Sequence, residues 1–179
     1  MSWARWVVVV CVSASLALAG CASTGRTTPA SQSTGVTTET LSTGAHVATV
    51  REAGLEFAIT LPVTVVTLGE RIDTNLSIRN ISETALDVRD HQIRVTFNEK
   101  ATGRSLGALQ YPETYFSPAR PLRLESGEST EVVMSFDTAD WSSAPVYSDI
   151  LTRRPLDISV RGSFSPPFLQ TPAIAVVVR

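Results

Sequence analysis

Short runs in which every second residue is apolar recur from Gly54 to the end of the chain, and they constrain the fold more than any other feature. Successive side chains of a β-strand point to opposite faces, so each run predicts a strand with one buried face. The runs span residues 55–61, 63–67, 72–80, 86–88, 93–97, 106–111, 132–136, 156–164 and 174–178. We therefore expect about eight or nine strands.

Turn-forming residues separate these runs, and no window of about a dozen residues has an apolar period of 3.6. Connecting helices and a parallel sheet are therefore not expected. Pro62 interrupts the first two runs, and proline has no N–H to give to a sheet ladder. We expect the strand to kink there and to cross from one sheet to the other. The pattern predicts an all-β protein, a β-sandwich of two sheets.

The order of turn and strand residues resembles bacterial immunoglobulin-like domains. Gly69-Glu70 precedes a strand that reads Leu76-x-Ile78-x-Asn80-x-Ser82, and Leu124-x-Ser126-Gly127-Glu128-Ser129 precedes another. The resemblance covers residues 55–136 and is similar in particular to the bacterial intracellular proteinase inhibitor family and to immunoglobulin-like adhesion modules. It implies a single immunoglobulin-like β-sandwich, and it raises proteinase inhibition as one function.

Residues 1–20 have the layout of an export signal. Arg5 supplies one positive charge, residues 6–19 carry none, and small residues follow. As a helix, this uncharged stretch of 14 residues would be about 21 Å long, against roughly 30 Å of hydrocarbon in a bilayer. We therefore expect a cleaved leader rather than a membrane-spanning helix.

The leader ends in Leu18-Ala19-Gly20-Cys21, which is identified as a bacterial lipobox. The resemblance implies that the Cys21 thiol takes a diacylglyceryl group, that the leader is cut before it, and that the new amino terminus can be acylated. One acyl chain holds a protein only marginally, whereas two or three hold it stably. We expect a lipoprotein of the cell membrane or outer membrane, with the rest of the chain on the extracytoplasmic side.

Half of residues 22–45 are serine or threonine, 4 and 8 of 24, and apolar side chains are scarce. Such a segment cannot bury enough surface to offset its ordering entropy. Residues 21–46 are therefore expected to be the lipidated cysteine and a flexible tether, and residues 47–179 one domain. Its 133 residues are a usual size for a single domain.

Composition excludes several classes of function. The two cysteines are Cys11, in the leader, and Cys21, so the domain has no thiol for a disulfide, a nucleophile or a cysteine metal site. Without the leader, 14 basic residues face 17 acidic ones, a net charge near −3. No basic stripe is present to neutralise phosphates, so a nucleic-acid partner is not expected.

Gly103-Arg104-Ser105-Leu106-Gly107 matches the G-x-S-x-G pattern of the hydrolase nucleophile elbow. That elbow lies between a strand and a helix of a parallel sheet. Ser105 instead lies between two predicted strands, so we expect a hairpin in which Gly103 supplies a turn conformation. A hydrolase that uses Ser105 or His91 remains a third hypothesis, behind the two given below.

Metal ligation is not indicated either. The expected mature chain has two histidines, His46 in or beside the tether and His91 in a link between strands, and neither belongs to a zinc pattern. We expect His91 to be a solvated turn residue. Asp137-x-x-Asp140 lacks the ligand spacing of a calcium loop, and Asp137 is expected to cap a turn after its strand. No cofactor is expected, and no enzymatic activity.

Two long irregular stretches, residues 111–121 and 137–155, are the candidate partner-binding loops, because long loops of compact domains are often functional. Their aromatic residues are the candidate contacts: Tyr111, Tyr115, Phe116, Trp141 and Tyr147. The alternative is that these aromatic side chains fold back and plug the ends of the sandwich.

The sequence thus favours a lipid-anchored envelope protein whose sandwich is a non-catalytic binding or scaffolding module. Its partners would be the membrane, through Cys21, and an envelope protein or a glycan. The alternative function is a proteinase inhibitor that presents a rigid loop to a protease, with residues 119–121 or 166–168 as candidate loops.

Overall fold

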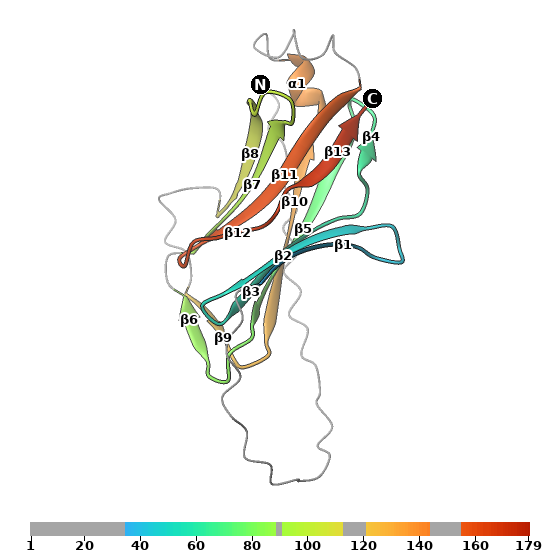
Figure 1. The fold of residues 1–179 in the computed structure, drawn as a ribbon. Helices are drawn as coiled ribbons and strands as arrows, with labels where there is room; N and C mark the ends of the chain where they lie inside the picture. The colour runs from blue at the N-terminus through green and yellow to red at the C-terminus, as the bar shows by residue number, and fades with distance from the viewer. Residues whose placement is uncertain (1–34, 89–90, 113–120, 144–154) are drawn as a thin grey trace.

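The computed structural model describes residues 35–88, 91–112, 121–143 and 155–179 (Figure 1). This part of the chain contains thirteen strands and one short helix, α1 (Ala139–Ser143). The strands form two sheets that pack face to face as a sandwich, with no closed barrel. The all-β prediction and the predicted sandwich are confirmed.

The first sheet has five strands in the order β1-β2-β3-β5-β10, and all neighbours are antiparallel. Its strands are β1 (Gly35–Thr40), β2 (His46–Glu52), β3 (Leu55–Leu61), β5 (Arg71–Asn80) and β10 (Ser129–Asp137). In β5, buried and exposed residues alternate as predicted, because every second side chain faces the opposite sheet.

The second sheet has six strands in the order β4-β13-β11-β7-β8, with β12 beside β11. They are β4 (Val65–Val66), β7 (Gln92–Glu99), β8 (Ser105–Tyr111), β11 (Leu156–Ser165), β12 (Leu169–Gln170) and β13 (Ile174–Val178). A separate two-stranded ribbon pairs β6 (Leu86–Val88) with β9 (Leu122–Leu124). This ribbon lies at one end of the sandwich and α1 at the other (Figure 1).

The connection between β3 and β4 crosses from one sheet to the other at Pro62, as predicted. β3 belongs to the five-stranded sheet, whereas β4 pairs with the last strand, β13, in the six-stranded sheet. This pairing is parallel, and the other pairings in the described part of the chain are antiparallel. The resulting two-sheet arrangement is an immunoglobulin-like sandwich.

Aromatic contacts between the two sheets form much of the core. The ring centroids of Phe57 and Phe164 are 6.0 Å apart, and those of Phe97 and Phe136 are 4.5 Å apart. Gly162 of β11 lies against the ring of Phe57. A Cβ at this position would lie 3.1 Å from Cε1 of Phe57, so a larger residue would crowd the inter-sheet packing.

Asn80 joins the end of β5 to the β6–β9 ribbon. Its side chain is fully buried, and Nδ2 donates to the carbonyl oxygens of Thr84 and Leu124 at 2.7 and 3.0 Å. Its Oδ1 accepts from the backbone N–H of Ser82 at 2.9 Å. The buried amide is therefore satisfied, and it fixes the turn that the sequence pattern predicted after this strand.

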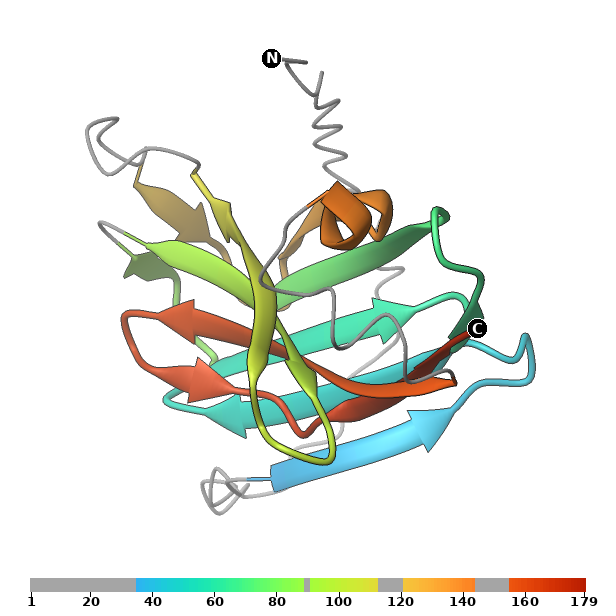
Figure 2. The same ribbon diagram turned by 90° about the horizontal axis from the view of Figure 1, so that it is seen from above.

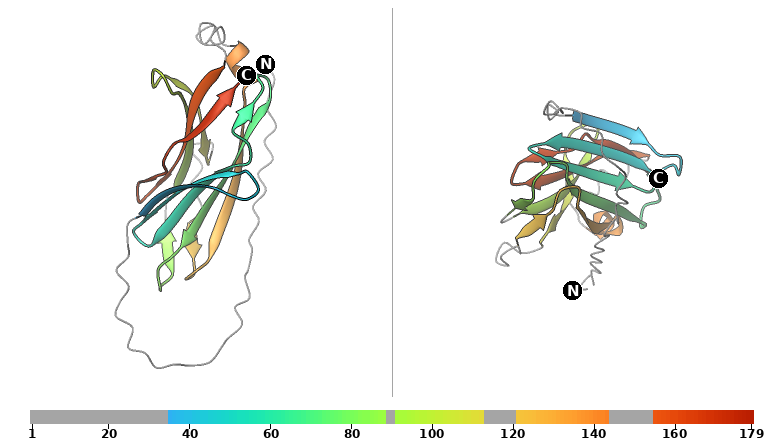
Figure 3. Two further views of the ribbon diagram at one scale, coloured as in Figure 1. Left: turned by 45° about the vertical axis from the view of Figure 1, so that its right-hand side comes forward. Right: turned by 90° about the horizontal axis from the view of Figure 1, so that it is seen from below.

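Four strands were not among the nine runs of the sequence: β1, β2, β9 and β12. β1 lies within the predicted tether and pairs with β2 along its whole length, from Gly35 opposite Arg51 to Thr40 opposite His46. The tether prediction is therefore wrong for residues 35–46, and ordered structure begins before residue 47. β1 lies at the margin of the molecule in both end views (Figures 2 and 3).

Candidate binding site on the six-stranded sheet

The outer face of the six-stranded sheet carries small or uncharged polar side chains, two arginines and one aspartate. Side chains that alternate with the buried residues of its strands form this face. They are Gln92, Arg94, Thr96 and Asn98 from β7, Ser105, Ala108 and Gln110 from β8, Asp157, Ser159, Arg161 and Ser163 from β11, and Ala175 and Val177 from β13. No aromatic side chain stands among them.

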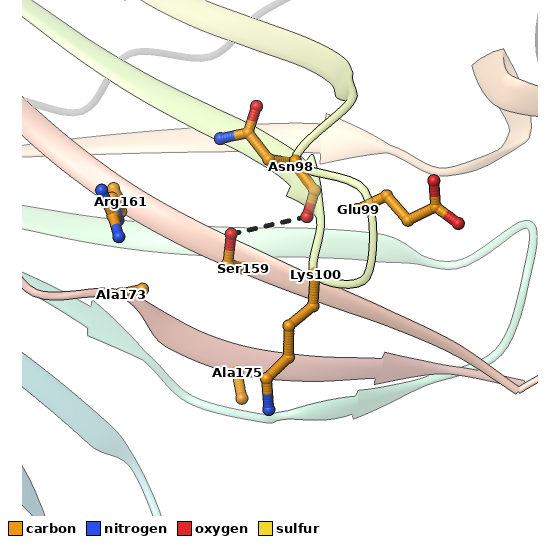
Figure 4. Close-up of a pocket in the computed structure, with 8 residues that line it drawn as sticks. Asn98, Glu99, Lys100, Ser159, Arg161, Ala173 and Ala175 are labelled. Atoms are coloured by element: carbon orange, nitrogen blue, oxygen red, sulfur yellow. Dashed lines mark hydrogen bonds between the residues drawn. The ribbon is translucent and has the colours of Figure 1, made fainter.

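A shallow hollow of about 560 Å³ lies on this face (Figure 4). We call it the Ser159 hollow, and its lining residues are Asn98, Glu99, Lys100, Gly103, Ser159, Arg161, Ala173 and Ala175. The register places Asn98 and Ala175 on either side of Ser159, on the two neighbouring strands. Because these side chains are short, the hollow stays open above the backbone of the sheet.

Two cations reach the Ser159 hollow from different elements. Lys100 extends from the loop after β7 past Ser159 toward Ala175, and Arg161 lies two residues along β11 (Figure 4). Within the described residues neither cation forms an ion pair or a side-chain hydrogen bond. The donors of both side chains therefore remain available to a ligand.

Glu99 lines the hollow but does not neutralise these cations. Only 5% of its surface is exposed, and its carboxylate accepts a hydrogen bond from the Thr102 hydroxyl. Its side chain points away from Ser159 and Arg161 (Figure 4). The described part of the hollow therefore presents positive charge and neutral polar groups.

Arg94 extends this positive surface. Arg161 stands opposite Thr96 in the ladder, and Arg94 stands opposite Ser163, so the two arginines occupy diagonal positions on adjacent strands. Diagonal neighbours of an antiparallel pair lie about 7–8 Å apart. Both arginines are exposed. Like charges repel at this distance unless an anion lies between or above them.

Two arginines of the five-stranded sheet, Arg71 and Arg51, have acidic partners. Nη2 of Arg71 donates to Asp73 at 3.0 Å, and Ser135 donates to the same carboxylate at 2.6 Å. The hydrogen bond from Ser135, with a smaller contribution from Arg71, holds the pKa of Asp73 below its usual value of 3.8 even though burial opposes the shift. Arg51 pairs with Glu56 at 2.6 Å. Lys100 and Arg161 have no such acidic partner among the described residues.

The G-x-S-x-G segment is a hairpin, as predicted. Ser105 is the first residue of β8 and pairs with Asn98 of β7 in an antiparallel ladder. Gly103 has φ +71°, a conformation that favours glycine in a turn. Asp137 likewise behaves as predicted, because its carboxylate accepts from the backbone N–H of Ala139 at 2.8 Å and so caps the turn after β10.

The prediction for His91 is wrong. Only 9% of this residue is exposed, and its ring stacks on Phe164 with 6.2 Å between centroids. Its Nδ1 is buried and has no hydrogen-bond partner among the described residues. Burial disfavours the charged imidazolium, and it lowers the pKa of His91 below the ordinary value of 6.5.

Trp141 belongs to the core and not to a binding surface. Its side chain is 2% exposed, it packs on Phe136 at 5.1 Å, and its Nε1 donates to the Leu106 carbonyl at 2.8 Å. The plugging alternative is therefore correct for this residue. Tyr111 ends β8, is half-buried and packs against the core, so it offers little free surface.

The remaining predicted site residues, Cys21, Tyr115, Phe116 and Tyr147, lie outside the described residues, as do residues 119–120 of one candidate inhibitor loop. Where the chain is described, no group of three or more His, Cys, Asp or Glu side chains is arranged to hold a metal ion. None of the described helices has the length and apolar character needed to cross a membrane.

Sequence reasoning missed the Ser159 hollow, although one signal was present. The run Ser159-Val160-Arg161-Gly162-Ser163 alternates inward apolar or glycine positions with small or basic outward ones. The inward residues of this run predict the strand β11. The outward residues, Ser159, Arg161 and Ser163, belong to the exposed face of the sheet. The approach of Lys100 depends on the pairing of β7 with β11, which local sequence does not specify.

The sequence matches no characterised protein family and no curated protein. Its structure is similar to parts of several solved proteins. A mutant β-glucosidase from Listeria innocua in complex with laminaribiose is 18% identical over 72% of this chain, with a TM-score of 0.44. An alkylpurine DNA glycosylase from Pseudomonas fluorescens, bound to DNA with an abasic site analogue, is 13% identical over 66% of this chain, with a TM-score of 0.43.

This chain covers 17% of the β-glucosidase chain and 28% of the glycosylase chain. The CARDB domain of a Pyrococcus furiosus protein, in complex with di-metal ions, is closer in length. It is 10% identical, covers 68% of this chain and 84% of its own, and has a TM-score of 0.40. Similarity at this level transfers neither activity nor ligand to this chain.

Proposed function

We propose that this chain is a lipid-anchored protein of the cell envelope whose immunoglobulin-like sandwich is a non-catalytic binding module, with the outer face of the six-stranded sheet as its contact surface. The binding role rests on two cations beside the open Ser159 hollow, Lys100 and Arg161. Neither forms an ion pair with a described residue. The anchoring role rests on the lipobox at Cys21 and on the apolar leader before it.

The short chain between Cys21 and β1 suits an anchored module. Gly35 lies 14 residues after Cys21, so even fully extended chain could separate the sheet from the lipidated residue by no more than about 50 Å. The module would therefore act close to the membrane surface. Its ligand would be a component of the envelope within that reach.

Metabolic labelling with a fatty acid analogue tests the anchor. We expect label on the wild-type protein and on the Cys11→Ser variant, which serves as the matched control, and none on Cys21→Ser. The labelled protein should sediment with membranes, because two or three acyl chains give lasting attachment. Equal labelling of the Cys21→Ser variant would show that Cys21 is not the lipidated residue, and an unlabelled wild type would show that this chain is not a lipoprotein.

One observation favours proteinase inhibition as a second candidate function. Phe168, in the turn between β11 and β12, is 69% exposed, the largest exposure among the bulky apolar residues described. However, buried Phe164 pairs with buried Leu169 directly across this turn, so the loop is short and presents a single side chain. A protease that cleaves after aromatic residues should be slowed by the wild-type chain and not by Phe168→Ser if this function is correct.

A further inference from the structure

We propose that the Ser159 hollow binds an oxyanion, a carboxylate or a phosphate, carried by an envelope ligand. This inference rests on the proposed binding role of the face and adds the chemistry of the ligand. It follows from the charge of the hollow, the size of its lining side chains and the position of the nearest acidic groups.

The charge of the hollow is positive in a protein whose balance is negative. Lys100 supplies a point charge with three donors, and Arg161 supplies a planar fork with five. The two side chains reach the hollow from different elements (Figure 4). Hydrogen bonds from such groups to a carboxylate or phosphate are shorter and stronger than bonds between neutral partners. An oxyanion is therefore the group that this donor set fits.

The lining adds room and neutral polar groups. Ala173, Ala175 and Gly103 leave space that long side chains would fill. The Ser159 hydroxyl has only a long contact of 3.5 Å to the backbone carbonyl of Asn98, so it can turn to donate to a ligand. A ligand larger than a simple ion can thus contact the Ser159 hydroxyl together with the cations that line the hollow.

The nearby acidic groups form no ion pair with Lys100 or Arg161 among the described residues. The Glu99 carboxylate is buried and points away from Ser159 and Arg161. Asp157, at the end of the same face, forms no ion pair with a described residue. The Asp157 backbone carbonyl instead accepts from the backbone N–H of Lys100 at 2.9 Å. Arg94 continues the positive surface beyond Arg161, and its charge raises the local attraction for an anion.

Three probes distinguish the sources of the oxyanion. Trigalacturonate carries carboxylates on a glycan, inorganic phosphate carries the second kind of oxyanion alone, and the methyl ester of trigalacturonate is the same glycan without charge. Binding to the purified full-length lipidated chain in neutral detergent is measured by calorimetry at low and high salt. We expect at least one of the two anions to bind, the ester to bind at least about tenfold more weakly than the acid, and high salt to weaken binding.

Charge-removing variants locate the site. Lys100→Gln and Arg161→Gln should each weaken binding of the anion by about tenfold, and the double variant by more. Arg71→Gln is the matched control, because this exposed arginine is paired with Asp73 and lies on the other sheet. It should bind as the wild type does. All of these side chains are on the surface, and far-UV circular dichroism verifies the fold.

Failure of both anions to bind would overturn the inference. So would equal binding of acid and ester where the acid binds, or an equal loss of binding in Arg71→Gln. These outcomes differ from failure of the proposed function. If Cys21 is not the anchor, the Cys21→Ser variant will carry as much fatty acid label as the wild type. Anion binding in detergent does not depend on that label. A protein that carries lipid but binds no anion would retain its place in the envelope and lose only this ligand class.

Discussion

The indole of Trp141, a residue of α1, is buried at the end of the sandwich. It fills space beside Phe136, and its single polar atom is satisfied by the Leu106 carbonyl at 2.8 Å. An aromatic residue in a segment predicted to be a loop can be exposed for binding or buried in the core, and local sequence does not distinguish the two. Burial of Trp141 depends on where β8 and β10 place their residues.

Replacing Trp141 tests this packing. Trp141→Phe keeps a ring but removes the Nε1 donor, and it should lower the free energy of unfolding by about 1–2 kcal/mol. Trp141→Ala also leaves a cavity, and it should lower it by about 3–5 kcal/mol. Urea titration followed by circular dichroism measures both. Wild-type stability in the alanine variant would contradict the buried position of the indole.

His91 gives the fold a dependence on pH. Because burial lowers its pKa in the folded state below 6.5, the unfolded chain binds the proton more readily. The stability present above about pH 7.5 is therefore lost as pH falls through about 6.5, until the lowered folded pKa is reached. We expect His91→Phe to lose less stability than the wild type between pH 7.5 and 5.5, measured by urea titration.

His46→Gln is the control for this titration. His46 lies at the start of β2, where its Nδ1 contacts the Thr40 hydroxyl at 3.2 Å. Its variant should keep the pH dependence of the wild type. If His91→Phe kept the full wild-type slope, another group would be responsible for it.

At the scale of elements, strands with a buried apolar face could be predicted and exposed or very short strands could not. β3, β5, β7, β10, β11 and β13 each bury alternate residues, so the period of two is visible. β1 has no buried side chain and is held by pairing with β2 alone. Its Thr-rich sequence predicts a flexible tether, because composition indicates whether side chains can be buried and does not indicate backbone pairing.

The candidate site divides in the same way. The sequence alone places Ser159 and Arg161 on the exposed face of one strand, because they alternate with buried Ile158 and Val160. Their proximity to Lys100 follows from the strand order β11-β7, which joins residues about 60 positions apart in the chain. The prediction that Trp141 contacts a partner was wrong for the same reason, because long-range packing determines its burial.

Two truncations separate the contributions of β1 and β2. A chain that begins at Leu41 lacks only exposed side chains of β1, and its free energy of unfolding should fall by about 1 kcal/mol or less. A chain that begins at Gly54 also lacks Ala48 and Val50, which are 0% and 4% exposed. It should lose about 3 kcal/mol or more. Equal stability of the two chains would contradict a structural role for β2.

At the scale of the whole molecule, the sandwich separates its stabilising groups from its candidate ligand groups. The core aromatic residues lie between the sheets, whereas Lys100, Arg161 and Arg94 lie on the outside of one sheet. Changes in the outer face can therefore alter binding without loss of the fold. β1 is the first described strand, and its first residue, Gly35, pairs with Arg51 near the Ala53-Gly54 turn. Gly54 lies close to Leu86 of the β6–β9 ribbon.

The position of β1 has a mechanical consequence. A pull on the chain ahead of Gly35 loads the terminal pair, Gly35 and Arg51, before any other pair of the sheet. The residue pairs between β1 and β2 then separate one after another. The core stays in place, because β1 has no buried side chain. Complete opening would free residues 35–45, about 36 Å of extended chain. We therefore expect the first strand to detach under tension before the sandwich unfolds.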